Sequence, residues 1–108
     1  MSLNFVQGDT APDIRSVLAD EDDPSVVVAL DEVTGVRFQM RRSDDRRYTV
    51  NAAAEVLDAP SGLVSYSWGA NDLAVPGTYL YQWELTWIGG RIQTTDPENP
   101  PTLVVRRQ

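Results

Sequence analysis

The sequence contains neither cysteine nor histidine. The absence of cysteine excludes disulfides, thiol nucleophiles and zinc–thiolate sites. The absence of histidine removes the usual general base at neutral pH and the commonest metal ligand. The remaining acid–base chemistry would need a pair of carboxylates, and no such pair stands out. We therefore expect a protein that is not an enzyme, with no catalytic residues, no metal and no cofactor.

Lysine is also absent, so nine arginines stand against 16 acidic residues and the net charge is −7. Such a surface repels polyphosphate at long range, and we expect no nucleic-acid partner. No apolar run is long enough to span a membrane, and the first residues lack a basic stretch followed by an apolar one. We therefore expect neither a membrane partner nor a signal peptide.

Aromatic residues, by contrast, are concentrated between positions 62 and 92. This segment holds all three tryptophans and three of the four tyrosines. Residues 79–88 alternate in character, and a period of two over this length predicts one long strand. We expect one face of this strand to be apolar. That face carries Tyr79, Tyr81, Trp83, Leu85 and Trp87.

The rest of the chain predicts shorter strands separated by turns rich in glycine, proline and aspartate. They cover residues 4–6, 13–19, 26–30, 36–41, 48–56, 64–68 and 102–106. The alanine run within 48–56 also fits a short helix, but alternation favours a strand. Its expected inward residues are Tyr48, Val50, Ala52, Ala54 and Val56. Gly89 and Gly90 predict a two-residue hairpin, because glycine tolerates positive φ.

Residues 72–79 (DLAVPGTY) fit a tyrosine corner, in which a tyrosine hydroxyl donates a hydrogen bond to upstream backbone. We expect structural roles for Trp68, Asp72, Gly77 and Tyr79. Together with the strand pattern, this predicts one all-β domain at residues 1–108, an antiparallel immunoglobulin-like β-sandwich of about 7–9 strands. Residues 1–12 would form an N-terminal arm, with a short edge strand in it.

Residues 41–47 (RRSDDRR), here called the arginine tip, form the densest cluster of charge in a predicted hairpin. Arginine pairs bidentately with carboxylates, so Arg41, Arg42, Arg46 and Arg47 are candidate contacts to an acidic protein partner. The alternative is a solvated turn whose aspartates partly neutralise its arginines.

The tryptophans allow two interpretations. A β-sandwich can present them as flat platforms for sugar rings, but aromatics that alternate along a strand are normally buried. The core interpretation is therefore favoured for most of them. Trp87 and Arg91 flank the Gly89–Gly90 turn, and we expect this tip to be the part of the segment that reaches a partner.

Two weaker patterns also leave alternatives open. Residues 20–23 (DEDD) offer oxygen ligands for calcium, but they lack the ligand spacing and the glycine of an EF-hand loop, so a solvated turn is favoured. The two terminal segments have enough β-propensity to add a strand to the sheet edge of a neighbouring protein. The alternative is that they fray.

Taken together, three segments resemble the N-terminal immunoglobulin-like domain of the baseplate upper protein family of tailed bacteriophages. They are residues 7–14 (QGDTAPDI), 33–41 (VTGVRFQMR) and 62–79, which includes GLVSYSW, Asp72 and GTY. Each is a common turn or core signal, but their order and spacing match over nearly the whole chain. The turn before Val36 is shorter than in the family, and residues 1–108 include no C-terminal fibre or helical region.

The resemblance implies a structural protein of the virion, in the baseplate or tail or as a head decoration. Its partners would be other virion proteins or copies of itself, and it would be made in the cytoplasm of the host bacterium. The alternative function is a carbohydrate-binding β-sandwich for recognition of the host surface. An adhesin-type domain of a bacterial surface protein is disfavoured by the expected lack of a signal sequence.

Overall fold

The computed structural model describes residues 3–18, 30–95 and 100–108. This part of the chain forms eight strands and no helix. The strands are β1 (Leu3–Val6), β2 (Ile14–Val17), β3 (Val33–Arg42), β4 (Tyr48–Asp58), β5 (Leu63–Tyr66), β6 (Gly77–Trp87), β7 (Ile92–Thr94) and β8 (Thr102–Arg106). The all-β class is as predicted. The acidic turn at 20–23 and, except for Leu30, the strand expected at 26–30 lie outside the described residues.

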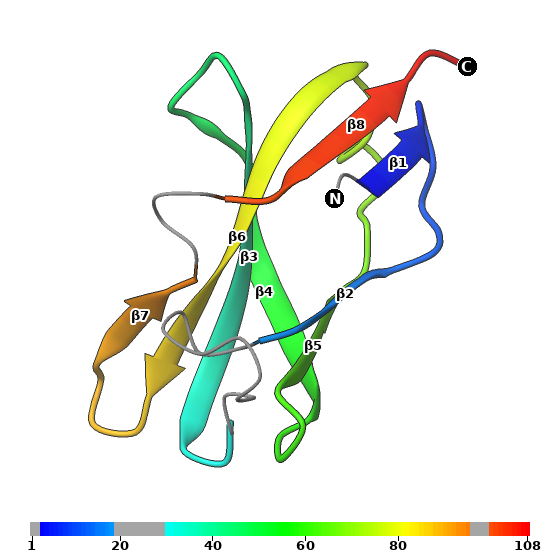
Figure 1. Cartoon of the computed structure of the whole chain (residues 1–108). Coiled ribbons are helices and arrows are strands. Elements are labelled where there is room, and N and C mark those ends of the chain that lie inside the picture. The colour runs from blue at the N-terminus through cyan, green and yellow to red at the C-terminus, as the bar shows by residue number, and fades with distance from the viewer. Residues whose placement is uncertain (1–2, 19–29, 96–99) are drawn as a thin grey trace.

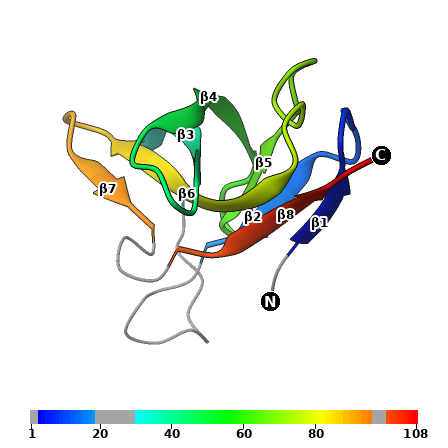
Figure 2. The same ribbon diagram turned by 90° about the horizontal axis from the view of Figure 1, so that it is seen from above.

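The strands join into one sheet that curls into two facing layers (Figures 1 and 2). Their order is β1-β8-β6-β3-β4-β5-β2, with β7 paired beside β6. The sheet turns at β4, which pairs with β3 along its first half and with β5 from Glu55 onward. Strands on both sides of this turn therefore contribute inward side chains to one core, which is the predicted β-sandwich.

The described strand pairs are antiparallel except β1 with β8, which run parallel. β8 lies between β6 and β1, and Phe5 of β1 is only 8% exposed. The short edge strand predicted within residues 1–12 is present as β1, and its aromatic side chain is anchored in the core. β8 pairs with β6 on one side and with β1 on the other. It therefore has no free edge with which to join the sheet of a neighbouring protein.

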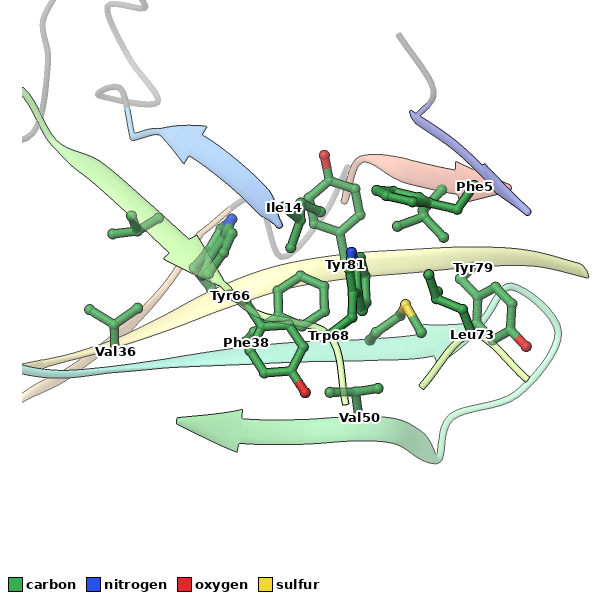
Figure 3. Packing of buried hydrophobic residues seen from close by; sticks show 14 of the residues in the cluster. Phe5, Ile14, Val36, Phe38, Val50, Tyr66, Trp68, Leu73, Tyr79 and Tyr81 are labelled. Atoms are coloured by element: carbon green, nitrogen blue, oxygen red, sulfur yellow. The ribbon is translucent and has the colours of Figure 1, made fainter. Parts of the chain in front are cut away.

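Phe38 of β3 is the centre of the core (Figure 3). Its ring stacks on Tyr66 at a centroid distance of 4.8 Å and meets Trp83 and Trp68 edge-on at 5.0 and 5.5 Å. Aromatic pairs at these distances add to the stabilisation that burial alone gives. Tyr79, Tyr81, Trp83 and Leu85 are buried too, so the apolar face predicted for β6 is the core.

Alternation along β4 fails at its start. Met40 lies opposite Val50, but the next residue of β3, Arg41, lies opposite Tyr48. The extra residue in β4 is a bulge, which turns the side chains beyond it to the other face. Tyr48 is therefore 43% exposed on the outer face, where its hydroxyl accepts a hydrogen bond from Gln82 at 2.9 Å. The inward placement predicted for Tyr48 was wrong.

The predicted tyrosine-corner hydrogen bond is present. The Tyr79 hydroxyl donates to the Val75 carbonyl at 2.6 Å, at the point where the chain enters β6. Gly77, between them, has a φ of 152°, and a Cβ there would lie 3.1 Å from the Arg42 guanidinium. Trp68 is buried before this corner, and its Nε1 donates to the Pro12 carbonyl at 3.1 Å. The strand order and this corner together are those of an immunoglobulin-like sandwich.

The hairpin between β6 and β7 uses three loop residues rather than the two predicted. Trp87 N donates to the Arg91 carbonyl at 2.7 Å, which leaves Ile88, Gly89 and Gly90 in the loop. The glycines do have the expected positive φ, 89° and 87°. Sequence alternation does not fix the last paired residues of a hairpin, so the loop length was out by one.

Candidate partner-binding sites

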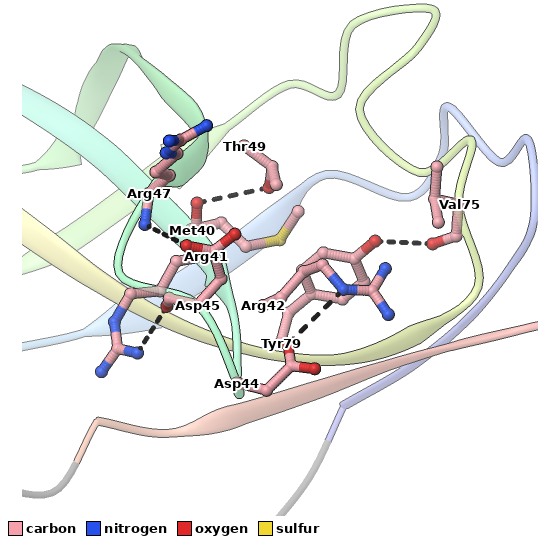
Figure 4. Close-up of polar contacts among 9 residues, drawn as sticks. All are labelled: Met40, Arg41, Arg42, Asp44, Asp45, Arg47, Thr49, Val75 and Tyr79. Atoms are coloured by element: carbon pink, nitrogen blue, oxygen red, sulfur yellow. Dashed lines mark hydrogen bonds and ion pairs between the residues drawn. The ribbon is translucent and has the colours of Figure 1, made fainter.

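The arginine tip closes the hairpin between β3 and β4 and is held firmly at its base (Figure 4). Ser43 N donates to the Thr78 carbonyl of β6 at 3.0 Å, and Asp45 N donates to the Arg42 carbonyl at 3.1 Å. The Asp45 carboxylate accepts from the backbone N–H of Arg47 at 3.0 Å. These bonds fix the backbone of a hairpin that projects from one end of the sandwich.

The four arginines of the tip divide into two pairs. Arg41 donates through Nη1 to the Asp45 carbonyl at 3.0 Å. The Arg42 guanidinium lies 5.6 Å from the centre of the Tyr79 ring and 3.7 Å from the Asp44 carboxylate. Arg46 and Arg47 are exposed, and their side chains contact no polar group within the described part of the chain. The first pair therefore supports the hairpin, and the second pair is free to meet a partner.

Trp87 lies at the opposite end, in a groove of about 410 Å³ lined by Glu32, Trp87, Arg91, Ile92 and Gln93, here called the Trp87 groove. The indole is half-buried, and its Nε1 donates to Gln93 Oε1 at 3.1 Å. Ile88 N donates to the Glu32 carbonyl at 2.7 Å, which brings the Glu32 segment to this hairpin. The groove therefore combines an oriented aromatic ring with one carboxylate and one guanidinium.

Two exposed apolar side chains lie on the hairpin that carries the Trp87 groove. Ile88 and Ile92 are 61% and 64% exposed, the two highest values among the large apolar side chains of the described residues. Ile92, at the start of β7, lines the groove, and Ile88 lies beside the glycine turn. Covering such side chains with a partner is favourable, at about 25 cal/mol for each Å² of apolar surface removed from water.

The six residues proposed from the sequence as partner contacts do not form one surface. Arg41, Arg42, Arg46 and Arg47 lie at one end of β3, and Trp87 and Arg91 lie at the other (Figure 1). β3 spans ten residues between these ends. At about 3.3 Å per residue, roughly 30 Å separates the arginine tip from the Trp87 groove.

Tyr66 and Asp72 form the other distinctive polar contact. The Tyr66 hydroxyl donates to Asp72 Oδ2 at 2.5 Å, and the same oxygen accepts from Gly69 N at 2.7 Å. Burial, together with the adjacent carboxylate, raises the pKa of Tyr66 well above its ordinary value near 10. A raised pKa keeps the phenol protonated at neutral pH. This pair therefore stabilises the loop before β6.

Two further features bear on ligands. A second hollow of about 350 Å³ lies between β1 and β2, lined by Leu3, Asn4, Phe5, Pro12, Asp13, Ile14 and Arg15. Within the described residues, no three acidic side chains are grouped so that they could hold a metal ion. The same residues include no helix long and apolar enough to cross a bilayer.

Comparison with known proteins gives a fold and no family. No protein-family profile matches the chain, and no curated protein matches its sequence. Among solved structures, the chain is similar to CopC from Methylosinus trichosporium OB3b, with a TM-score of 0.51 and 8% sequence identity. The likeness covers 98% of this chain and 86% of that one. At such low identity it supports the β-sandwich architecture alone.

Sequence reasoning missed Glu32 and Gln93 as parts of the Trp87 groove. Glu32 reaches Trp87 because Val33 pairs with Trp87 in the sheet, across more than fifty positions of sequence. No local pattern encodes that register. Gln93 alternates with Ile92 and Thr94 in a three-residue strand, which is too short for periodicity to reveal.

Proposed function

We propose that this protein is a non-enzymatic structural component of a bacteriophage virion, in the baseplate or tail or as a head decoration, and that it acts through contacts with other virion proteins. The observation that carries the proposal is the ordered resemblance of residues 7–14, 33–41 and 62–79 to the baseplate upper protein domain. Two of these segments include the start of β2 and most of β3, and the third spans β5, the tyrosine corner and the start of β6.

The chemistry of the described residues supports a binding role. The pKa of the Tyr66 phenol is raised, and this shift opposes its ionisation at neutral pH. The free guanidinium groups of Arg46 and Arg47 project from a rigid hairpin, which suits docking on an acidic neighbour. A sandwich with an ordered aromatic core is a stiff support for such contacts.

Mass spectrometry of gradient-purified virions tests this proposal. We expect the chain to be present in a fixed ratio to the major structural proteins. Its absence from washed particles, while it is abundant in the infected cell, would refute a virion role.

A variant that carries Arg46→Glu and Arg47→Glu tests the role of the arginine tip. We expect its melting temperature to stay within about 2 °C of wild type, because exposed charges contribute little to stability. Its incorporation into particles should fall strongly. The matched control carries Arg15→Glu and Arg107→Glu, which make the same charge change at exposed positions away from the tip. A large loss of melting temperature in the tip variant would show that these arginines are structural.

The Trp87 groove favours one second candidate, a carbohydrate-binding module for the host surface. Its half-exposed indole, one carboxylate and one amide are groups that can stack on and hydrogen-bond to a sugar ring. A glycan array with wild type and Trp87→Ala checks this function. Binding that Trp87→Ala abolishes would support it, and no binding by the wild type would remove it.

A further inference from the structure

We infer that the Trp87 groove receives the arginine tip of a second copy of this chain, so that copies associate head to tail. This deepens the proposed function, on which it rests, by naming the partner of the free arginines. The two surfaces lie on one chain, and both are accessible within the described residues. The arginine tip of a chain cannot reach the groove of the same chain, because the two lie at opposite ends of β3.

The chemistry of the two surfaces is complementary. A guanidinium placed over the Trp87 indole makes a cation–π contact, for which tryptophan is the best side chain. Glu32, on the wall of the groove, can pair with the same cation or with its neighbour. Arg91, which also lines the groove, can pair with the exposed Asp44 carboxylate of the incoming tip. Arginine on the tip thus matches glutamate in the groove, and aspartate on the tip matches arginine in the groove.

Both surfaces are also ordered before they meet. The indole is oriented by its hydrogen bond to Gln93, and the tip is fixed by the Ser43–Thr78 and Asp45–Arg42 backbone bonds. Preorganised surfaces lose less conformational entropy when they associate. Ile92 is exposed and lines the groove, so an incoming hairpin would cover it, which adds an apolar contribution.

The geometry of this contact has a consequence for assembly. Tip and groove are different surfaces, so the interface is heterologous, and such contacts generate rings or open chains of subunits. The net charge of −7 opposes association at long range. At physiological ionic strength the Debye length is about 8 Å, so this repulsion is largely screened while direct contacts at the interface remain.

Sedimentation velocity of the purified full chain, from micromolar to millimolar protein at physiological salt, tests the inference. We expect a concentration-dependent series of oligomers. The tip variant (Arg46→Glu with Arg47→Glu) and two groove variants, Trp87→Ala and Glu32→Arg, should each weaken association by at least about tenfold, the effect of losing one desolvated cation contact. Glu32 is exposed, so Glu32→Arg keeps the test valid if Trp87→Ala fails to fold. The Arg15→Glu, Arg107→Glu control should associate like wild type.

Mixing the tip variant with the Trp87→Ala variant gives the decisive result. Each is blocked alone, but the intact tip of one fits the intact groove of the other, so the mixture should form dimers and stop there. A wild type that is monomeric throughout, or a mixture that stays monomeric, overturns the inference. So does a wild type whose groove binds a glycan while the chain remains monomeric. These outcomes differ from a failure of the virion role, which is measured on particles.

Discussion

The contact between Tyr66 and Asp72 gives the sharpest prediction about stability. The hydroxyl donates to an ionised carboxylate at 2.5 Å, beside a ring that is part of the core. A hydrogen bond to a charged group contributes about 1.5–3 kcal/mol to folding. We therefore expect Tyr66→Phe to lower the free energy of unfolding by about that amount. At about 4 °C per kcal/mol for a domain of this size, the melting temperature should fall by about 6–12 °C.

The pH dependence of this effect follows from the raised pKa of Tyr66. Because the pKa is higher in the folded state, the contribution is fully present below pH 10, the ordinary tyrosine pKa, and is lost as the pH rises above it. Above pH 10 the difference in free energy of unfolding between wild type and Tyr66→Phe should therefore shrink, by about 1.4 kcal/mol per pH unit at most.

Urea unfolding followed by tryptophan fluorescence, at pH 8 and again between pH 10 and 11, measures both effects. Tyr48→Phe is the matched control, since the Tyr48 side chain is exposed and its hydroxyl accepts a hydrogen bond from the Gln82 amide; we expect a change under about 0.5 kcal/mol. A double-mutant cycle with Asp72→Asn should show a coupling of about 1 kcal/mol or more. This account of the contact would be refuted by a difference in free energy of unfolding between wild type and Tyr66→Phe that is negligible at pH 8. A difference that is equal at both pH values would refute it too.

Three further variants probe the corner and the core. Tyr79→Phe removes the bond to the Val75 carbonyl, and thermal unfolding should show a loss of about 1 kcal/mol; no loss would mean that the corner is not stabilising. Phe38→Ala empties the centre of the aromatic cluster, and urea denaturation should show a loss of about 3–5 kcal/mol, whereas a loss under 1 kcal/mol would contradict the packing described. Gly77→Ala forces a Cβ against Arg42 at a positive φ, so its melting temperature should fall, while Gly8→Ala, with open space around it, isolates the cost of positive φ alone.

The sequence was a good guide to the sandwich and to its corner because both depend on local patterns. Alternation along residues 79–88 places one set of side chains inward whichever strands flank β6, namely Tyr79, Tyr81, Trp83 and Leu85. The tyrosine corner is likewise confined to a few consecutive residues, and its hydrogen bond spans four positions.

Features that depend on the register between distant strands were not predictable. Tyr48 faces outward because of a bulge opposite Arg41, and a bulge leaves no mark in the alternation of a single strand. Gln39, on the outer face of β3, is buried because it lies under a polar cluster with Gln82 and Glu84 of β6. The Trp87 groove depends in the same way on the pairing of Val33 with Trp87.

The division of the arginine tip could not be predicted from its sequence either. Arg42 and Arg46 have similar acidic neighbours in the chain, yet only Arg42 lies over a tyrosine ring. That ring belongs to β6 and reaches the tip because Arg42 pairs with Tyr79 in the sheet. The pairing makes Arg42 part of the fold and leaves Arg46 available to a partner.

A cryo-electron microscopy map of the intact phage particle tests the central claim most directly, because it shows whether the chain is built into the virion and what its arginine tip meets there. We predict density for the eight-stranded sandwich in a regular array, with Arg46 and Arg47 seated against protein. Absence of the sandwich from the particle, or an arginine tip that faces solvent in every copy, would contradict the account.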